Sequence, residues 1–184
     1  MTSTTLKTER LILRPWRAAD REAFAAMSAD PEVMQFLSPL IDRAASDAIV
    51  DRLSKHIEEH GFGFWALEAP GVAPFVGFTG LIHVGDDMPF APAVEVGWRL
   101  AREHWGNGYA SEAARAALAF GFDELKLDEI VALTVPANLR SQAVMKRIGM
   151  SHDKSDDFEH PRLKAGDPLK SHVLYRAKRD AFRP

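Results

Sequence analysis

The sequence predicts one α/β domain built on a mixed, mostly antiparallel sheet that helices flank. The first observation is a change of hydrophobic period, from helical over residues 43–60 to strand-like over 62–101. The second is that the 184 residues contain no internal repeat, low-complexity tract or linker. A chain of this length suits one domain with a sizeable core. We therefore assign residues 1–184 to a single domain.

The first third of the chain predicts a strand followed by two helices. Residues 10–16 form the strand, which Pro15 stops, and residues 18–29 form the first helix. The second helix covers 43–60 and ends at Gly61, a natural C-terminal stop. Its apolar stripe consists of Ile49, Leu53 and Ile57.

The middle of the chain predicts three neighbouring strands. Residues 62–69 and 74–84 are rich in aromatic and branched side chains and are separated by turn residues. Residues 93–101 alternate, so that successive side chains face opposite sides of a sheet. One side receives Val94, Val96, Trp98 and Leu100, and the other receives Glu95, Gly97 and Arg99.

The last third predicts two helices and two strands. A helix begins near Tyr109, and residues 129–135 read as a buried strand. A short helix over 138–149 has Asn138 as N-cap, and residues 171–178 form the last strand. One face of the first of these helices carries small side chains that allow close packing on a sheet: Ala110, Ala113, Ala114 and Ala117, followed by Leu118.

Composition excludes several classes of protein. The formal net charge of −3 gives no basic field for nucleic acid, and no apolar run is long enough to span a membrane. The absence of cysteine excludes disulfides, thiolate metal sites and a cysteine nucleophile. The N-terminal segment lacks the apolar region of a secretory signal. We expect a cytoplasmic protein that binds neither nucleic acid nor membrane.

The stretch "WGNGYASEA", residues 105–113, predicts an anion site. Gly106 and Gly108 lie between a strand and the helix that begins near Tyr109. The first N–H groups of a helix have no partner within the helix, and the helix dipole adds partial positive charge there. Such a loop accepts a pyrophosphate without a lysine. The alternative is a tight turn whose glycines serve backbone geometry alone. The spacing matches neither a Walker loop nor G-x-G-x-x-G.

Three segments carry a resemblance to a known family. "WGNGYASEA" resembles the pyrophosphate loop Gln/Arg-x-x-Gly-x-Gly/Ala of the GCN5-related N-acetyltransferase (GNAT) superfamily, with Trp105, Gly108 and Ala110 at the patterned positions. Trp105 departs from the usual Gln or Arg. "TERLILRPWRAAD" (8–20) and "VPANLRSQAVMKRIGM" (135–150) are similar to the branch that contains the ribosomal-protein N-terminal acetyltransferases.

The resemblance implies an acyl-CoA N-acyltransferase fold with acetyl-CoA as co-substrate, bound between the fourth and fifth strands. The strand around Gly97 would pair with the pantetheine arm; a glycine there also fits a bulge or simple packing. The residues implied to bind acetyl-CoA are Trp98, Leu100, Trp105, Gly106, Asn107, Gly108, Tyr109, Ala110, Asn138 and Ser141.

Acetyl transfer to an amine requires a base, because amines are protonated near pH 7. Without cysteine, direct attack on the thioester is favoured over a cysteine-bound intermediate. Glu95 is the first candidate base, since related enzymes often have a catalytic Glu in this strand. His83, on the neighbouring strand, is the second candidate. Both residues have structural alternatives, a solvent-facing carboxylate and a packed histidine.

The segment 138–149 supplies the remaining catalytic candidates. Asn138 resembles the family asparagine that hydrogen-bonds the cofactor arm, and it can also cap the helix. The position of the frequent tyrosine general acid is Met145, which has no acidic proton. We therefore expect Ser141 or solvent to serve the departing thiolate.

The seven histidines do not show H-E-x-x-H or a similar spacing, and we expect no metal site; residues 152–161 read as a loop. The expected acceptor is an amine, either a protein N-terminus or a small molecule. The alternative function is a non-catalytic acyl-CoA-binding sensor. The family habit also suggests a homodimer.

Overall fold

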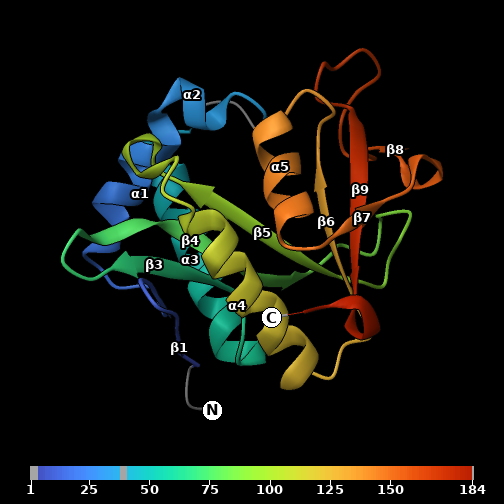
Figure 1. Cartoon of the computed structure of the whole chain (residues 1–184). Coiled ribbons are helices and arrows are strands. Elements are labelled where there is room, and N and C mark those ends of the chain that lie inside the picture. Colours follow the sequence, from blue (N-terminus) through green and yellow to red (C-terminus); the bar gives the residue numbers. More distant parts are fainter. Residues whose placement is uncertain (1–3, 38–40, 184) are drawn as a thin grey trace.

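The computed structural model describes residues 4–37 and 41–183, which fold around one nine-stranded sheet (Figure 1). The strand order is β1-β2-β3-β4-β5-β6-β9-β7, with β8 paired to β9. All pairs are antiparallel except β5 with β6. The predicted fold class, a mixed and mostly antiparallel sheet flanked by helices, is confirmed.

The strands are β1 Leu6–Lys7, β2 Ile12–Arg14, β3 Phe64–Ala69, β4 Ala73–His83, β5 Val94–Leu100, β6 Glu129–Thr134, β7 Ser151–His152, β8 Phe158–Glu159 and β9 Ser171–Lys178. The helices are α1 Asp20–Ala29, α2 Pro31–Met34, α3 Arg43–His60, α4 Tyr109–Asp123 and α5 Leu139–Arg147. Short 3-10 turns are η1 Arg102–His104, η2 Lys154–Asp156 and η3 Arg179–Ala181.

The parallel strands β5 and β6 meet at one point and then separate. Glu95 pairs with Val131, whereas β4 runs beside β5 along its whole length. Figure 1 shows the two strands diverging from this point, with α4 and α5 beside the opening. Beyond Glu95, the edge of β5 that faces β6 therefore has no strand partner, and its backbone groups are available to another molecule.

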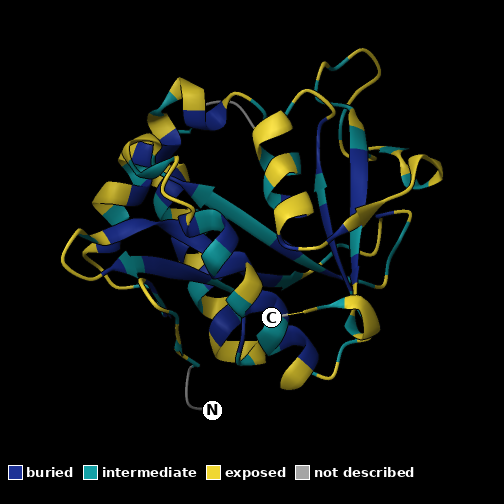
Figure 2. Cartoon of the chain, in the orientation of Figure 1, coloured by how far each residue is buried: buried dark blue, intermediate teal, exposed yellow. Residues whose placement is uncertain are grey.

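Two apolar clusters pack against the sheet, and Figure 2 shows that its central strands are largely buried (dark blue). On one face, Ala113, Ala114 and Ala117 of α4 are fully buried, which brings this helix close to the strands as the sequence predicted. On the other face, Phe24 of α1 and Phe78 of β4 belong to an aromatic cluster beneath α1 and α3. The opening between β5 and β6 thus lies in a sheet that apolar side chains pack against on both faces.

The local predictions differ from the structure in several places. The strand β1, which pairs with β2, was not predicted. The strand expected over 10–16 is only β2, because a turn closed by Thr8 N–H to the Leu11 carbonyl at 2.9 Å precedes it and Pro15, which has no N–H, follows it. Arg14, the last residue of β2, forms a buried ion pair with Asp20, Nη1 to Oδ2 2.8 Å. The short helix α2 was not predicted; the Asp30 carboxylate caps it by accepting a hydrogen bond from the Glu32 N–H. Residues 152–161, expected as loop, contain β8 and η2 and the end of β7.

Candidate active site

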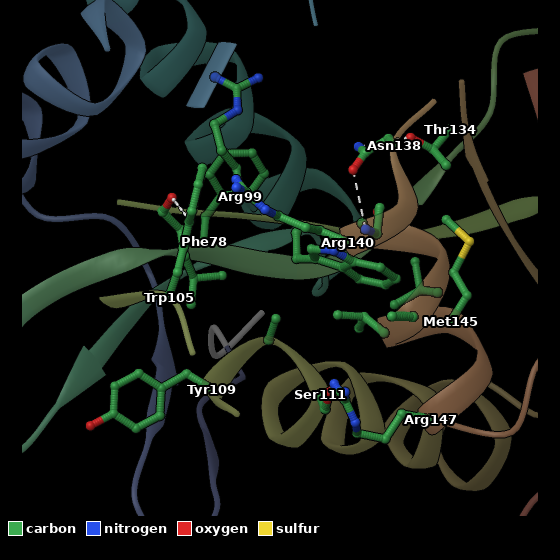
Figure 3. A pocket seen from close by; sticks show the side chains of 18 of the residues that line it. Phe78, Arg99, Trp105, Tyr109, Ser111, Thr134, Asn138, Arg140, Met145 and Arg147 are labelled. Atoms are coloured by element: carbon green, nitrogen blue, oxygen red, sulfur yellow. Dashed lines mark hydrogen bonds between the residues drawn. The ribbon is translucent and has the colours of Figure 1, made fainter. Parts of the chain in front are cut away.

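A cavity of about 600 Å³ occupies the opening between β5 and β6 (Figure 3). Most of its wall comes from β5, the loop that leads into α4, the first turn of α4, the end of β6, and α5, and β3 and β4 add Phe64 and Phe78. Every residue predicted to bind acetyl-CoA lines this cavity except Asn107, and Glu95 lines it too. The lining residues that the sequence did not single out include Leu37, Phe64, Phe78, Arg99, His104, Ser111, Thr134, Arg140 and Arg147.

The loop before α4 presents backbone N–H groups to the cavity. Within the described part of the chain, the N–H groups from Gly106 to Ser111 donate no hydrogen bond; the first helical bond runs from Glu112 N to Gly108 O at 3.1 Å. Gly106 and Gly108 have φ values of 79° and 80°, a left-handed conformation that favours glycine. The glycines therefore fit both interpretations of the sequence, the tight turn and the anion site, because they shape a turn that exposes N–H donors.

The N-terminal segment holds this loop from outside. Arg10 Nη1 donates to the Asn107 carbonyl at 3.0 Å, and Arg10 Nη2 lies 2.6 Å from Glu112 Oε2. Thr8 Oγ1 donates to the other Glu112 oxygen at 2.6 Å. The Asn107 side chain donates to the His104 carbonyl at 3.2 Å, so it stiffens the turn. The resemblance of residues 8–20 was the available signal for this clamp, but it did not specify the contact with Glu112.

Arginine side chains surround the same loop. The Arg140 guanidinium lies 4.6 Å from the centroid of the Trp105 ring, and Trp105 Nε1 donates to the Leu100 carbonyl at 2.9 Å. Arg147 Nη1 donates to Ser111 Oγ at 3.1 Å in the first turn of α4. The loop thus combines free N–H groups with nearby positive charge, which favours an anion. Figure 3 shows the Tyr109 ring turned away from the other labelled residues.

Glu95 lies where β5 and β6 meet, at the closed end of the opening. Burial raises the pKa of its carboxyl to about 7. A carboxyl with this pKa is partly ionised near neutral pH and can accept a proton there. A strong shift in a cavity is typical of functional carboxylates. Its place in the cavity lining favours the role of base over that of a solvent-facing strand carboxylate.

Gly97 makes room for an aromatic ring. A Cβ atom built on Gly97 would lie 2.8 Å from Phe64 Cζ and 3.7 Å from Glu95 Oε1. The structure therefore supports the packing explanation for this glycine. The Phe64 ring, held over the strand beside Glu95, contributes to the apolar surroundings that raise the pKa of the carboxyl.

Arg99 brings a half-buried cation to the same face of β5. Its guanidinium lies 5.3 Å from the Phe78 ring centroid, and its Nε is buried without a hydrogen-bond partner in the described residues. Burial lowers its pKa to about 10, which leaves it charged at neutral pH. A weak contact with Ser28 Oγ at 3.5 Å does not satisfy this group. Arg99 is a functional candidate that the sequence placed on the right face without assigning a role.

His83, the second candidate base, does not reach the cavity. Ile82 pairs with Glu95 across β4 and β5, and side chains alternate along a strand, so His83 projects from the opposite face. Its ring packs with those of His56 and His60 at the end of α3. Burial, with a smaller contribution from His60, also lowers its pKa. The structure therefore removes His83 from the candidate bases.

The amide of Asn138 is used at the start of α5. Its Oδ1 accepts a hydrogen bond from the Ser141 N–H at 3.2 Å, and its Nδ2 donates to Thr134 Oγ1 at 3.0 Å (Figure 3). The residue is the predicted N-cap and also lines the cavity. Met145 lies below it, almost fully buried, so the position of the frequent tyrosine acid is apolar here.

The hydroxyl groups of the cavity differ in their partners. Ser111 accepts a hydrogen bond from Arg147, and Thr134 accepts one from Asn138. In the described residues, the Ser141 hydroxyl forms no hydrogen bond. Tyr175 does not line the cavity, and its hydroxyl donates to Gln142 Oε1 at 3.2 Å. Ser141 is thus the hydroxyl most free to serve a ligand.

Comparison with known proteins identifies the family. The profile of the acetyltransferase (GNAT) domain matches residues 10–151, so the chain belongs to the GNAT acetyltransferases. The predicted superfamily is confirmed, and membership in it supports the prediction of an acetyltransferase enzyme. No helix in the described ranges is long and apolar enough to cross a membrane.

Two relatives and one solved structure illustrate the similarity. The uncharacterized protein YkkB of Bacillus subtilis is 35% identical over 83% of this chain and 88% of its own length. The FsC-acetyl coenzyme A-N(2)-transacetylase of Aspergillus fumigatus is 34% identical over 80% of this chain and 65% of its own length. A GNAT acetyltransferase from Bacillus anthracis superposes with a TM-score of 0.81 at 25% identity, covering 96% of this chain and 99% of that one.

Proposed function

We propose that this chain transfers the acetyl group of acetyl-CoA directly to a primary amine. The observation that carries the proposal is the row of free N–H groups from Gly106 to Ser111, which opens into the cavity at the N-terminus of α4. Such a row binds a pyrophosphate through backbone donors. The name of the Aspergillus relative includes acetyl coenzyme A, which supports the same co-substrate.

The proposed reaction uses the two ends of the cavity. The pyrophosphate binds at the loop, and the pantetheine arm runs along the unpaired edge of β5 toward Glu95. The ammonium group of the acceptor first loses a proton to Glu95, directly or through water, and the neutral nitrogen then attacks the thioester carbonyl carbon. The carbon–sulfur bond breaks while the Ser141 hydroxyl donates a hydrogen bond to the departing thiolate. The second proton of the nitrogen then reaches the thiolate, directly or through solvent. A thiol pKa near 8.5 makes this departure easy.

Arg99 supports an acceptor that carries an oxygen close to its amine. The Nε of Arg99 is buried without a hydrogen-bond partner in the described residues, which is costly unless a ligand satisfies it. The backbone carbonyls of a peptide N-terminus would accept its hydrogen bonds, whereas a simple alkylamine would not. The resemblance to the ribosomal-protein N-terminal acetyltransferases favours the same acceptor. We therefore propose that the acceptor is a protein N-terminus and not a small amine.

The remaining sequence predictions belong to this proposal. The domain extends over residues 1–184, supported by β9, which completes the sheet outside the family match. The proposed catalytic residues are Glu95, Ser141 and Asn138, the last as a positioning residue at the start of α5. A homodimer and a cytoplasmic location stay predictions from the sequence.

The decisive experiment is a turnover assay that detects free CoA thiol with acetyl-CoA and a panel of amines. The panel includes peptides with a free N-terminus, the same peptides with a blocked N-terminus, and alkylamines without a carbonyl. Thiol release only with free peptide N-termini is the expected result. Tight acetyl-CoA binding without release for any acceptor would favour the alternative, a non-catalytic acyl-CoA sensor.

A further inference from the structure

Three histidines meet outside the cavity, at the end of α3. His56 and His60 lie one helical turn apart, and His83 is the last residue of β4. Their ring centroids are 4.4 Å apart for His56 and His60, 5.0 Å for His60 and His83, and 5.8 Å for His56 and His83. The fold thus brings together residues that are far apart in the sequence and have no role in the proposed reaction.

The geometry of the cluster suits a metal ion. One ring nitrogen of each histidine lies within 4.8 Å of the other two. Three imidazoles on a tetrahedral zinc ion, with Zn–N near 2.0–2.1 Å, have nitrogens about 3.3 Å apart. The difference is small enough for side-chain rotation to close, because His60 and His83 are exposed and free to adjust.

An independent observation points to a ligand at this cluster. Nε2 of His56 is buried, and it has no hydrogen-bond partner in the described residues. Buried polar atoms in folded proteins nearly always have a partner. A hollow of about 510 Å³ lies against the same rings, and the oppositely charged Asp86 and Arg52 also line it. The hollow and the unpartnered nitrogen therefore belong to the same group of histidines.

We propose that His56, His60 and His83 form a binding site for a divalent transition-metal ion of the zinc type, with water completing the coordination. Imidazole nitrogen is a preferred ligand of zinc, copper and nickel, whereas magnesium prefers oxygen. The proposal departs from the sequence-based expectation of no metal site. The spacing of His56 and His60 on one helical face was a signal, but His83 joins them only in the fold.

The position of the site assigns it a structural role. A bound ion would join the end of α3 to the end of β4, next to the hairpin that leads into β5. His83 projects from the face opposite Glu95, so the ion would not contact the reacting groups. A ligand that binds only the folded chain raises its melting temperature. Zinc should therefore stabilise the protein without changing the chemistry at Glu95.

The test uses protein from which every affinity tag has been removed. Zinc is titrated by calorimetry, and Co²⁺ replaces zinc so that absorption reports the coordination. We expect one ion per chain, a rise in Tm of several degrees with Zn²⁺, and no rise with Mg²⁺. His60→Gln and His83→Gln should each abolish or strongly weaken this binding. His152→Gln is the control, because this exposed histidine pairs with Asp157 far from the cluster.

The two histidine variants keep the test informative if one of them folds poorly, since His60 is exposed on α3 and circular dichroism checks both. Absence of saturable zinc binding in the wild type would overturn the proposal. Stoichiometric binding that survives in both folded variants would overturn it too. Neither result depends on acetyl transfer, so the proposed function stands or falls separately.

Discussion

The two sides of the cavity are built in different ways. The proposed acetyl-CoA side consists of backbone N–H groups from one continuous segment, Gly106 to Ser111, at the start of α4. The proposed acceptor side consists of side chains from different strands: Phe64 on β3, Phe78 on β4, and Glu95 and Arg99 on β5. A backbone site is fixed by local conformation, whereas a side-chain site depends on the packing of the whole sheet. The first should therefore tolerate most side-chain changes, and the second should not.

The largest effect is expected for Glu95→Gln. The substitution keeps the shape of the side chain and removes the proton acceptor, and loss of a general base typically lowers the rate about 10²–10⁴-fold. Affinity for CoA should stay within a few-fold, since the loop donors are untouched. Steady-state kinetics with calorimetry on the same preparation checks both. Wild-type turnover in this variant would show that the acceptor side does not depend on this carboxylate.

The pH dependence of kcat/KM also tests whether Glu95 is the general base. With a pKa of about 7, Glu95 is protonated and inactive in acid, so kcat/KM should rise as pH increases through about 7. The acceptor amine also loses its proton near pH 8. Comparison with Glu95→Gln separates the two ionisations, because only the rise caused by the acceptor amine should remain in the pH profile of this variant. An identical profile in both proteins would contradict the assignment.

Stability should change with pH in the opposite direction. The pKa of Glu95 is raised above the ordinary value of 4.5, so the folded chain holds this proton more tightly than the unfolded chain. The free energy of unfolding should therefore fall as pH rises from about 4.5 to 7. A shift of this size is worth about 3 kcal/mol. Denaturation at pH 8 should show Glu95→Gln to be more stable than the wild type; equal or lower stability would contradict the burial of a charge there.

A smaller effect is expected for Arg99→Gln. If the guanidinium binds a carbonyl of the acceptor, its loss removes a charge-assisted hydrogen bond and should raise KM for peptide acceptors about tenfold. KM for acetyl-CoA should change little. Arg115→Gln provides a control, because this arginine donates to the Arg147 carbonyl on the surface and does not line the cavity. An equal change in both variants would mean that Arg99 does not act on the acceptor.

The smallest effect is expected for Ser141→Ala. A thiolate leaves readily without help, so loss of the hydroxyl should lower kcat only a few-fold and leave acetyl-CoA affinity intact. The Ser141 N–H, which Asn138 caps, remains in the variant. Unchanged kcat in a folded variant would mean that solvent, and not Ser141, assists the departing thiolate.

The same contrast explains how far the sequence could predict the site. The loop of residues 105–113 was predictable because its glycines, helix start and free donors are local properties of a few successive residues. The alternation over 93–101 placed Glu95 and Arg99 on one face for the same reason. Their raised and lowered pKa values were not predictable, because they arise from burial against Phe64 and Phe78 in other strands. The clamp of Arg10 on Glu112 and the meeting of His83 with α3 also depend on tertiary packing.

The central claim, that backbone donors of this loop bind CoA, is tested most directly by calorimetry on two glycine variants. Gly108→Val forces a branched side chain into φ of 80°, where a non-glycine residue costs about 1–2 kcal/mol, and so distorts the row of donors. Gly71→Val introduces the same strain at φ of 78° in the turn between β3 and β4, away from the cavity. We predict that both variants lose stability, but that only Gly108→Val loses CoA affinity, by at least about tenfold. Unchanged CoA affinity in a folded Gly108→Val variant would contradict the account.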